Sequence, residues 1–188
     1  MKFAFGATAF AASMLFIVAS AAGAQDAVSL FDPVTGYRVT HYRGVVDRAA
    51  EGFTRIDIDR VVALQRRAVF IDVTPAEGGV RADDGTWRLA MPHATIPGAH
   101  WFPEAGRGEL APGIGAWFDQ GVKQLARGRH DRPIVIFCLA DCWMSWNAGL
   151  RLRRAGYGRV LWFAEGIDGW KESGRALADV KPARIQAR

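Results

Sequence analysis

Cysteine is scarce in this sequence, because only two of its 188 residues, Cys138 and Cys142, are cysteines. This scarcity excludes a disulfide framework as the main source of stability, since a bridge across so short a loop removes little chain entropy. It also excludes a closed four-thiolate zinc site in a monomer. The close spacing of the pair indicates that the two thiols act together in chemistry.

Long apolar runs are missing beyond the start of the chain, and no later segment approaches the roughly 20 apolar residues that a membrane span needs. The start is different: Lys2 is followed by small and apolar residues and then by Ala22-Gly23-Ala24. This order is typical of a secretory signal peptide that is cleaved after Ala24. We therefore expect residues 1–24 to be removed and the mature chain to act in the periplasm without a stable membrane span.

A concentrated basic surface is also lacking, although the formal net charge is +5. The basic residues are scattered, and the cluster Arg151, Arg153 and Arg154 has no interleaved aromatic residues. Such a cluster on one helix is typical of a solvated face rather than of a nucleic-acid site. We expect no nucleic-acid partner.

Short apolar runs alternate with helical patterns along the rest of the chain. The runs at 69–73, 134–137 and 160–163 predict buried parallel strands, and the spacing of apolar residues predicts helices near 57–64, 115–126 and 145–155. We expect an α/β domain with a mainly parallel central sheet flanked by helices. The predicted organisation is a signal peptide (1–24), an N-terminal extension packed on the domain (25–52), the domain itself (53–180) and a C-terminal tail (181–188), with a long loop over 75–95.

Five sequence pieces in this order resemble the rhodanese-like family. They are Phe70-Ile71-Asp72-Val73, the turn from His93 to Ala99, the junction from Ile134 to Cys138, Ala155-Gly156-Tyr157, and the segment from Glu165 to Trp170. The resemblance implies a rhodanese-like domain, with the reactive cysteine at Cys138 and sulfurtransferase-type chemistry.

The segment from Cys138 to Asn147 is similar, more narrowly, to the signature of a periplasmic rhodanese-like subfamily named for its CXXCW motif. This resemblance implies an association with PQQ-dependent alcohol catabolism and a redox role. The partner that it implies is a periplasmic redox protein or a component of a quinoprotein system.

Cys138 is the predicted nucleophile. A thiol between a parallel strand and a helix faces the positive end of the helix dipole, which lowers its pKa and favours the thiolate. We expect Cys138 to attack and Cys142 to resolve through thiol–disulfide exchange, so that a reversible disulfide forms between them.

The loop between the two cysteines carries no positive charge. Leu139, Ala140 and Asp141 follow Cys138, and the carboxylate of Asp141 repels anionic sulfur donors. These residues are expected to line the substrate side of the site and to disfavour thiosulfate. Asp141 is equally a candidate cap for the helix that follows.

Thiol–disulfide exchange through Cys138 and Cys142 requires no cofactor. Two alternative functions use the same loop. Cys138 and Cys142 are candidate ligands for Cu(I), with His93 or His100 as a third ligand. Alternatively, Trp143 and Trp146 line a pocket for a flat quinone-type ligand at the carboxyl edge of the sheet, in a non-catalytic binding module. Asp72, which ends a predicted strand, is expected to anchor loop hydrogen bonds rather than to catalyse.

Overall fold

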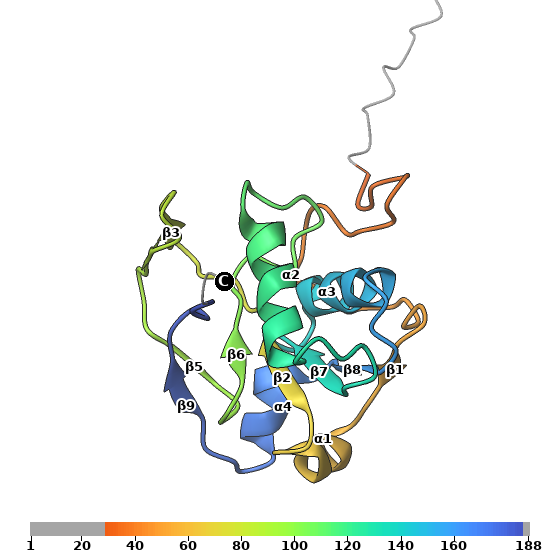
Figure 1. Cartoon of the computed structure of the whole chain (residues 1–188). Helices are drawn as coiled ribbons and strands as arrows, with labels where there is room; N and C mark the ends of the chain where they lie inside the picture. The colour runs from red at the N-terminus through yellow and green to blue at the C-terminus, as the bar shows by residue number, and fades with distance from the viewer. Residues whose placement is uncertain (1–28, 186–188) are drawn as a thin grey trace, which may run out of the picture.

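The computed structural model describes residues 29–185, so the predicted signal peptide lies outside the described residues. Strands and helices alternate along this part of the chain except over residues 69–101, where five strands follow one another (Figure 1). The elements are β1 (Thr54–Arg55), α1 (Ile58–Leu64), β2 (Val69–Asp72), β3 (Val80–Arg81), β4 (Trp87–Arg88), β5 (His93–Thr95), β6 (His100–Trp101), α2 (Ile114–Leu125), β7 (Ile134–Phe137), α3 (Trp143–Arg154), β8 (Val160–Phe163), α4 (Gly166–Glu172) and β9 (Ala178–Val180).

The central sheet has five strands in the order β1-β8-β7-β2-β6, and every neighbouring pair is parallel. All four residues of β2 and of β7 are buried. Strands that are covered on both faces need near-continuous apolar sequences, which explains why short apolar runs located them. The predicted α/β fold with a mainly parallel sheet is confirmed.

Successive residues of β7 alternate between the two faces of the sheet. Ile134 and Ile136 belong to the hydrophobic cluster that contains α2 and α3, whereas Val135 and Phe137 belong to the cluster that contains α1 and α4. Figure 1 shows these two helix pairs on opposite sides of the sheet. Cys138 continues the first series, and its side chain therefore lies on the α2/α3 side.

The helix boundaries follow local signals in the sequence. Asp57 is the N-cap of α1, and its carboxylate accepts the backbone N–H of Arg60 at 2.9 Å. Gly156 follows α3 with φ +89°, a left-handed conformation that ends a helix and suits glycine. The observed bounds of α2 and α3 lie within two residues of the predicted ones.

The predicted loop over 75–95 is wrong in part, because it contains three short strands. β3 and β4 form an antiparallel hairpin whose turn is closed by the Ala82 N–H to Thr86 carbonyl bond at 2.8 Å. β5 pairs with β9, which lies more than eighty residues later in the chain. Strands of two or three residues with such a distant partner leave almost no local hydrophobic period to detect.

Both segments that flank the predicted domain pack onto it. Asn147 of α3 accepts the N–H of Arg38 at 2.9 Å and donates to the Arg38 carbonyl at 2.8 Å, which joins the extension to the domain. The predicted tail is also attached, since the Ala183 N–H donates to the carbonyl of Trp101 at 2.8 Å. The folded unit thus includes residues on each side of the predicted boundaries.

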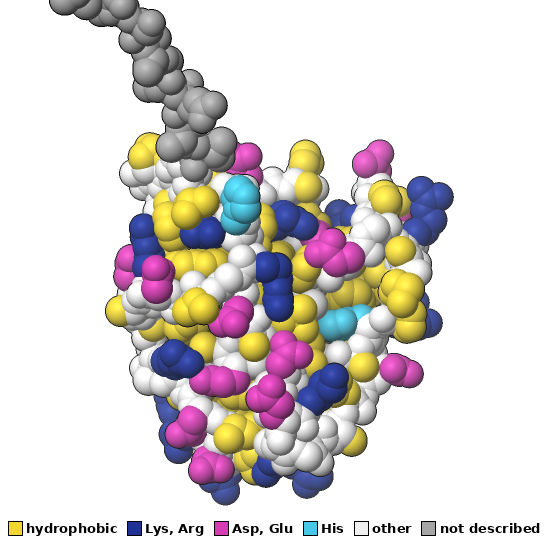
Figure 2. All heavy atoms as spheres, turned by 180° about the vertical axis from the view of Figure 1, so that it is seen from behind, with side chains coloured by type: hydrophobic (Ala, Val, Ile, Leu, Met, Phe, Trp, Pro, Cys, Tyr) yellow, Lys and Arg dark blue, Asp and Glu magenta, His cyan; other side chains and the backbone are white. Residues whose placement is uncertain are grey.

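Positive and negative side chains are interspersed over the face seen in Figure 2. This face carries no continuous basic surface of the kind that tracks a nucleic-acid backbone. Between residues 29 and 185, no helix combines the length and the apolar character needed to cross a membrane.

Candidate functional site

The two cysteines lie at the junction between β7 and α3. Cys138 directly follows β7, and Cys142 is the N-cap residue of α3. Both thiols are free and buried, with exposed fractions of 0% for Cys138 and 3% for Cys142. The Cys138 sulfur lies 3.5 Å from the carbonyl oxygen of Cys142, so the fold brings the predicted pair together.

Hydrogen bonds from α4 fix the backbone of the cysteine loop, residues 138–143. The Ile167 N–H donates to the Cys138 carbonyl at 2.8 Å, and the carboxylate of Asp168 accepts the Ala140 N–H at 2.9 Å. Gly166 has φ +56°, and a Cβ atom there would lie 1.9 Å from the Cys138 carbonyl oxygen. Only glycine therefore allows α4 to approach the loop this closely.

The surroundings of Cys138 favour the neutral thiol. Its sulfur lies 3.5 Å from the carbonyl oxygens of both Leu139 and Cys142. Complete burial raises the pKa of Cys138 well above its ordinary value, and the neighbouring Cys142 sulfur raises it further. The backbone and hydroxyl of Ser145 act in the opposite direction but do not reverse the shift. The expected lowering of the Cys138 pKa by the helix dipole is thus wrong, because burial and the neighbouring Cys142 sulfur outweigh it.

The surroundings of Cys142 favour the thiolate. The pKa of Cys142 is lowered, first because the Cys138 thiol donates a hydrogen bond to its sulfur. Burial opposes this shift, while the Met144 N–H and the guanidinium of Arg43 support it. The lowered pKa that the sequence predicted for Cys138 is therefore found at Cys142.

The N-terminal extension covers the cysteine loop. Arg43 forms an isolated antiparallel bridge with Cys142. This bridge is flanked by the Gly44 N–H to Asp141 carbonyl bond at 2.8 Å and the Trp143 N–H to Tyr42 carbonyl bond at 2.9 Å. The sequence analysis did not identify Arg43 as a site residue. The only sequence signal was an aromatic and basic stretch ending at Arg43, and nothing in it indicates a partner one hundred residues away.

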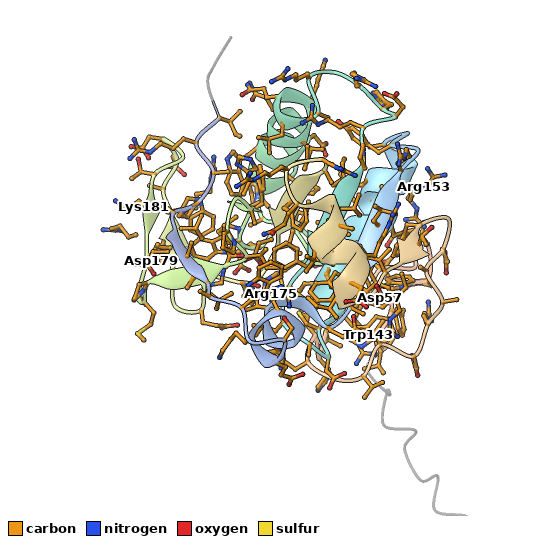
Figure 3. All side chains as sticks on the ribbon, turned by 90° about the horizontal axis from the view of Figure 1, so that it is seen from below. Asp57, Trp143, Arg153, Arg175, Asp179 and Lys181 are labelled. Carbon is orange, nitrogen blue, oxygen red and sulfur yellow. The ribbon has the colours of Figure 1, made fainter. Side chains whose placement is uncertain are left out.

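Trp143 and Trp146, the predicted walls of a ligand pocket, are buried side chains that contact the N-terminal extension. Both are almost completely buried, and Trp143, labelled in Figure 3, packs edge-on against the ring of Phe31 at 5.1 Å. The Trp146 indole N–H donates to the Ala49 carbonyl at 3.2 Å. Both indoles thus pack against the N-terminal extension.

The residues between the cysteines have separate environments. Ala140 and Asp141 line a small cavity of about 130 Å³ beside the Arg55–Glu165 ion pair. Leu139 is half-buried and packs against both hydrophobic clusters. Asp141 is not the cap of α3, because Cys142 takes that position and Asp141 has φ +48°.

His93 does not lie with the cysteines. Its Nε2 atom lies 2.7 Å from the carboxylate of the fully buried Asp72, whose backbone pairs in register with Phe137 on the α1/α4 side of the sheet. Asp72 also accepts the Thr74 N–H at 2.8 Å, which confirms its predicted anchoring role. No group of three or more potential metal-binding side chains occurs within residues 29–185. The third copper ligand expected from His93 or His100 is therefore not in place.

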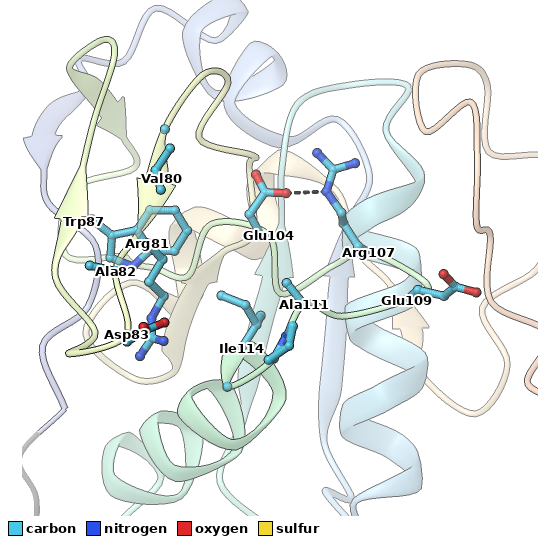
Figure 4. A pocket seen from close by; sticks show the side chains of 13 residues that line it. Val80, Arg81, Ala82, Asp83, Trp87, Glu104, Arg107, Glu109, Ala111 and Ile114 are labelled. Carbon is cyan, nitrogen blue, oxygen red and sulfur yellow. Dashed lines mark hydrogen bonds and ion pairs between the residues drawn. The ribbon is translucent and has the colours of Figure 1, made fainter.

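A larger cavity of about 710 Å³ lies between the β3–β4 hairpin and the start of α2 (Figure 4). Arg81, Trp87 and the ion pair between Glu104 and Arg107 contribute to its walls. Its described lining includes neither cysteine, so this cavity is separate from the cysteine loop.

Comparisons with solved structures give limited similarities. The polysulfide-sulfur transferase homodimer of Wolinella succinogenes is 17% identical over 68% of this chain and 79% of that chain, with a TM-score of 0.43. The thiosulfate sulfurtransferase of Pseudomonas aeruginosa is 20% identical over 72% of this chain and 22% of that chain, with a TM-score of 0.48. Wild-type EanB is 21% identical over 62% of this chain and 25% of that chain, with a TM-score of 0.37. The aligned region thus spans about a quarter of the latter two proteins, and no curated protein matches this chain significantly.

The family comparison is more extensive. Residues 59–173, from α1 to the end of α4, match the model of the rhodanese-like domain. The matched region contains the central strands of the parallel sheet and the whole cysteine loop. Since it covers more than half of the sequence, this chain belongs to the rhodanese-like domain family.

Proposed function

We propose that the Cys138–Cys142 pair accepts sulfur from a persulfide or polysulfide donor and resolves it by forming a disulfide. The observation that carries this proposal is the pair of free thiols at the junction of β7 and α3, where the Cys138 sulfur lies 3.5 Å from the Cys142 carbonyl oxygen. Membership of the rhodanese-like family supports sulfur transfer as the class of reaction.

The proposed reaction has two exchange steps. In the first, one cysteine thiolate attacks the sulfane sulfur of the donor, a new S–S bond forms, and the donor leaves as a thiolate with the electron pair of the broken bond. In the second, the other cysteine attacks the sulfur of the persulfidated cysteine, the disulfide forms, and hydrosulfide leaves. Two electrons pass from the cysteine pair to the sulfane sulfur, and an external dithiol reduces the disulfide again.

The surroundings of the loop favour an uncharged or protein-bound donor over thiosulfate. Asp141 and Glu165 lie at the small cavity beside the loop, and the only cation among its lining residues, Arg55, is paired with Glu165. A dianion that approaches from this cavity meets the carboxylate of Asp141 and a neutralised ion pair, and no free cation of the cavity lining attracts it. The extension must also move before a donor reaches either sulfur, because both thiols are buried beneath it.

We further propose that this chemistry takes place in the periplasm, in association with PQQ-dependent alcohol oxidation, and that the reductant is a periplasmic redox partner or a component of the quinoprotein system. The signal-like sequence at residues 1–24 supports the location, and the cysteine–tryptophan signature supports the association. Cell fractionation and loss of growth on alcohols in a deletion strain test these two statements separately.

The reaction is tested by mass spectrometry of the reduced protein after incubation with polysulfide. We expect the wild-type chain to gain a disulfide and release sulfide, whereas Cys138→Ser and Cys142→Ser each fail to form the internal disulfide. Wild-type protein that keeps two free thiols in polysulfide, with no sulfide released, would contradict the proposal. Titration with Cu(I) in the same series examines the alternative, which requires stoichiometric binding that both substitutions abolish.

A further inference from the structure

A concave basic site lies at the opposite end of β7 from the cysteine loop. It is a depression of about 470 Å³, and five arginines contribute to its lining: Arg60, Arg67, Arg129, Arg132 and Arg159. Small-molecule sites have volumes of about 300 to 1,000 Å³, so the depression is large enough for a ligand. The chain from Arg132 through β7 to Cys138 spans about 20 Å at the rise of an extended strand. The basic depression is therefore separate from the cysteines.

The parallel sheet brings three of these arginines together. β2, β7 and β8 are neighbours, and their first residues are paired side by side. Arg67, Arg132 and Arg159 each lie one or two positions before one of these strands. Because neighbouring strands are about 4.8 Å apart, Arg132 on the middle strand starts within the Debye length of about 8 Å from the other two. Arginines that are scattered in the sequence thus meet at the edge where the strands begin.

The carboxylates of the depression do not balance this charge. Asp131 supplies the only carboxylate of the lining, and its two oxygens accept from Arg129 at 3.1 and 2.8 Å. Hydrogen bonds from Arg129 lower the pKa of Asp131, and the charge of Arg159 lowers it further. Within residues 29–185, the side chains of Arg60, Arg67, Arg132 and Arg159 make no hydrogen bond or ion pair. One carboxylate therefore faces five guanidinium groups.

Arg132 is the half-buried member of this group, whereas the other four arginines are exposed. Its Nε atom is enclosed, and no atom in the described part of the chain accepts a hydrogen bond from it. A partly buried cation among other cations is unfavourable unless an anion neutralises it. The position of Arg132 thus indicates an anionic ligand rather than an ordinary solvated surface.

The chemistry of the lining favours a soluble phosphate compound over other anions. A phosphate group offers three acceptor oxygens at one point, which suits several converging guanidinium groups better than the two oxygens of a carboxylate. A membrane surface is disfavoured, because none of the large exposed apolar side chains of residues 29–185 belongs to the lining. The described lining also contains no aromatic side chain on which a nucleic-acid base would stack.

We propose that the basic depression is a binding site for a soluble phosphate compound with at least two negative charges, of the phosphomonoester or diphosphate class. Arg132 and the exposed Arg60, Arg67 and Arg159 hold the phosphate oxygens. The ligand then bridges α1 and the starts of three neighbouring strands, and it stabilises the folded chain. This site goes beyond the proposed sulfur transfer and does not depend on it.

Calorimetric titration and thermal unfolding test the proposal, with pyrophosphate as the probe. We expect one binding site per chain and an increase in Tm of about 5 to 10 °C at a pyrophosphate concentration about one hundred times Kd. Succinate, whose two charges lie on separate carboxylates, should bind at least about tenfold more weakly, the effect of losing one charge-assisted hydrogen bond. Pyrophosphate that does not bind, or succinate that binds as tightly, would overturn the proposal.

Substitution of the exposed arginines locates the site. We expect Arg60→Gln and Arg159→Gln each to weaken pyrophosphate binding at least about tenfold. Neither change should lower Tm in the absence of ligand, because each relieves repulsion between like charges. Arg88→Gln is the matched control, since it removes the same charge from an exposed residue of β4 outside the depression. This control should change the affinity by less than about twofold, because charges beyond the Debye length are largely screened.

An equal loss of affinity in Arg88→Gln would show that pyrophosphate responds only to net charge, and the site would be rejected. Sedimentation with phosphatidylglycerol vesicles provides a second arm. Vesicle binding that requires Arg60 and Arg159, in a protein that does not bind pyrophosphate, would assign these arginines to a membrane surface instead. Neither arm involves the thiols, so their outcome is independent of the sulfide-release assay.

Discussion

Asn147 connects three segments of the chain at a single buried side chain. Its amide oxygen accepts the Arg38 N–H, and its amide nitrogen donates to the carbonyls of Arg38 and Gly106, at distances of 2.8 to 2.9 Å. The side chain is completely buried, so water does not replace these bonds without a rearrangement. Asn147 lies in α3, whose N-cap is Cys142, and it thereby fixes the extension relative to the cysteine loop.

We expect Asn147→Ala to lower the free energy of unfolding by about 2 to 4 kcal/mol, because it leaves three buried backbone groups without partners. Urea denaturation followed by circular dichroism measures this loss. Lys123→Ala on the exposed side of α2 is the control and should change the free energy by less than about 0.5 kcal/mol. An Asn147→Ala variant as stable as the control would show that the three bonds contribute no net stability.

The sequence was sufficient to predict that Cys138 and Cys142 share one loop site, but not which of the two thiols has the lowered pKa. The helix-dipole argument applies to any thiol between a strand and a helix. The pKa of Cys138 is decided first by burial and then by the Cys142 sulfur, and both depend on the path of the loop. The pKa of Cys142 is lowered first by the Cys138 thiol, and Arg43, which adds to this shift, meets Cys142 only through a long-range bridge.

At the scale of elements, the N-terminal extension is shaped by a turn at Asp32. The carboxylate of Asp32 accepts both the N–H and the hydroxyl of Thr35, at 2.5 and 2.7 Å, and its backbone carbonyl accepts the Gly36 N–H at 2.8 Å. This turn precedes Tyr37, which is buried in the cluster of α2 and α3. The direction in which the extension crosses α3 therefore depends partly on one exposed carboxylate.

The Asp32 turn should respond to acid. Hydrogen bonds from the hydroxyl and then from the N–H of Thr35 hold the pKa of Asp32 below its ordinary value of 3.8. A carboxyl whose pKa is lowered by folding stabilises the folded form above the unfolded pKa, and this contribution is lost as pH falls through the folded pKa. We expect the amide signal of Thr35 to shift in an NMR titration with a midpoint below pH 3.8. The shift should disappear in Asp32→Asn, and a midpoint at or above 3.8 would contradict the assigned hydrogen bonds.

The elements that the sequence located well are those with many local signals. β2, β7 and β8 are short apolar runs, and α2 has buried residues at helical spacing. The elements that were missed, β3, β4 and β5, have at most three residues each. Their existence depends on partners rather than on composition, as the pairing of β5 with β9 illustrates.

At the scale of the whole molecule, the segment that follows the rhodanese-like match packs back onto the domain. The match ends at residue 173, but β9 then pairs with β5 and the chain continues to the edge of the central sheet. There the Ala183 N–H bonds to Trp101 of β6, and the Ala183 carbonyl accepts the indole N–H of Trp117 from α2 at 3.1 Å. Ile185 packs on the core and would collide with a Cβ atom at Gly121. The C-terminal segment thus joins the edge strand of the sheet to the helix that covers it.

We expect a chain that ends at Leu177 to unfold at a lower temperature than a control chain that ends at Ile185. The truncation removes the β5–β9 pairing and both bonds of Ala183, each worth about 1 kcal/mol, so a loss of at least about 3 kcal/mol is expected. For a protein of this length the loss corresponds to a decrease in Tm of about 6 to 12 °C. Calorimetry measures the decrease, and a red shift of the tryptophan fluorescence should accompany it, because Trp101 and Trp117 lose their cover. Equal melting temperatures for the two chains would show that the sheet and α2 hold together without the C-terminal segment.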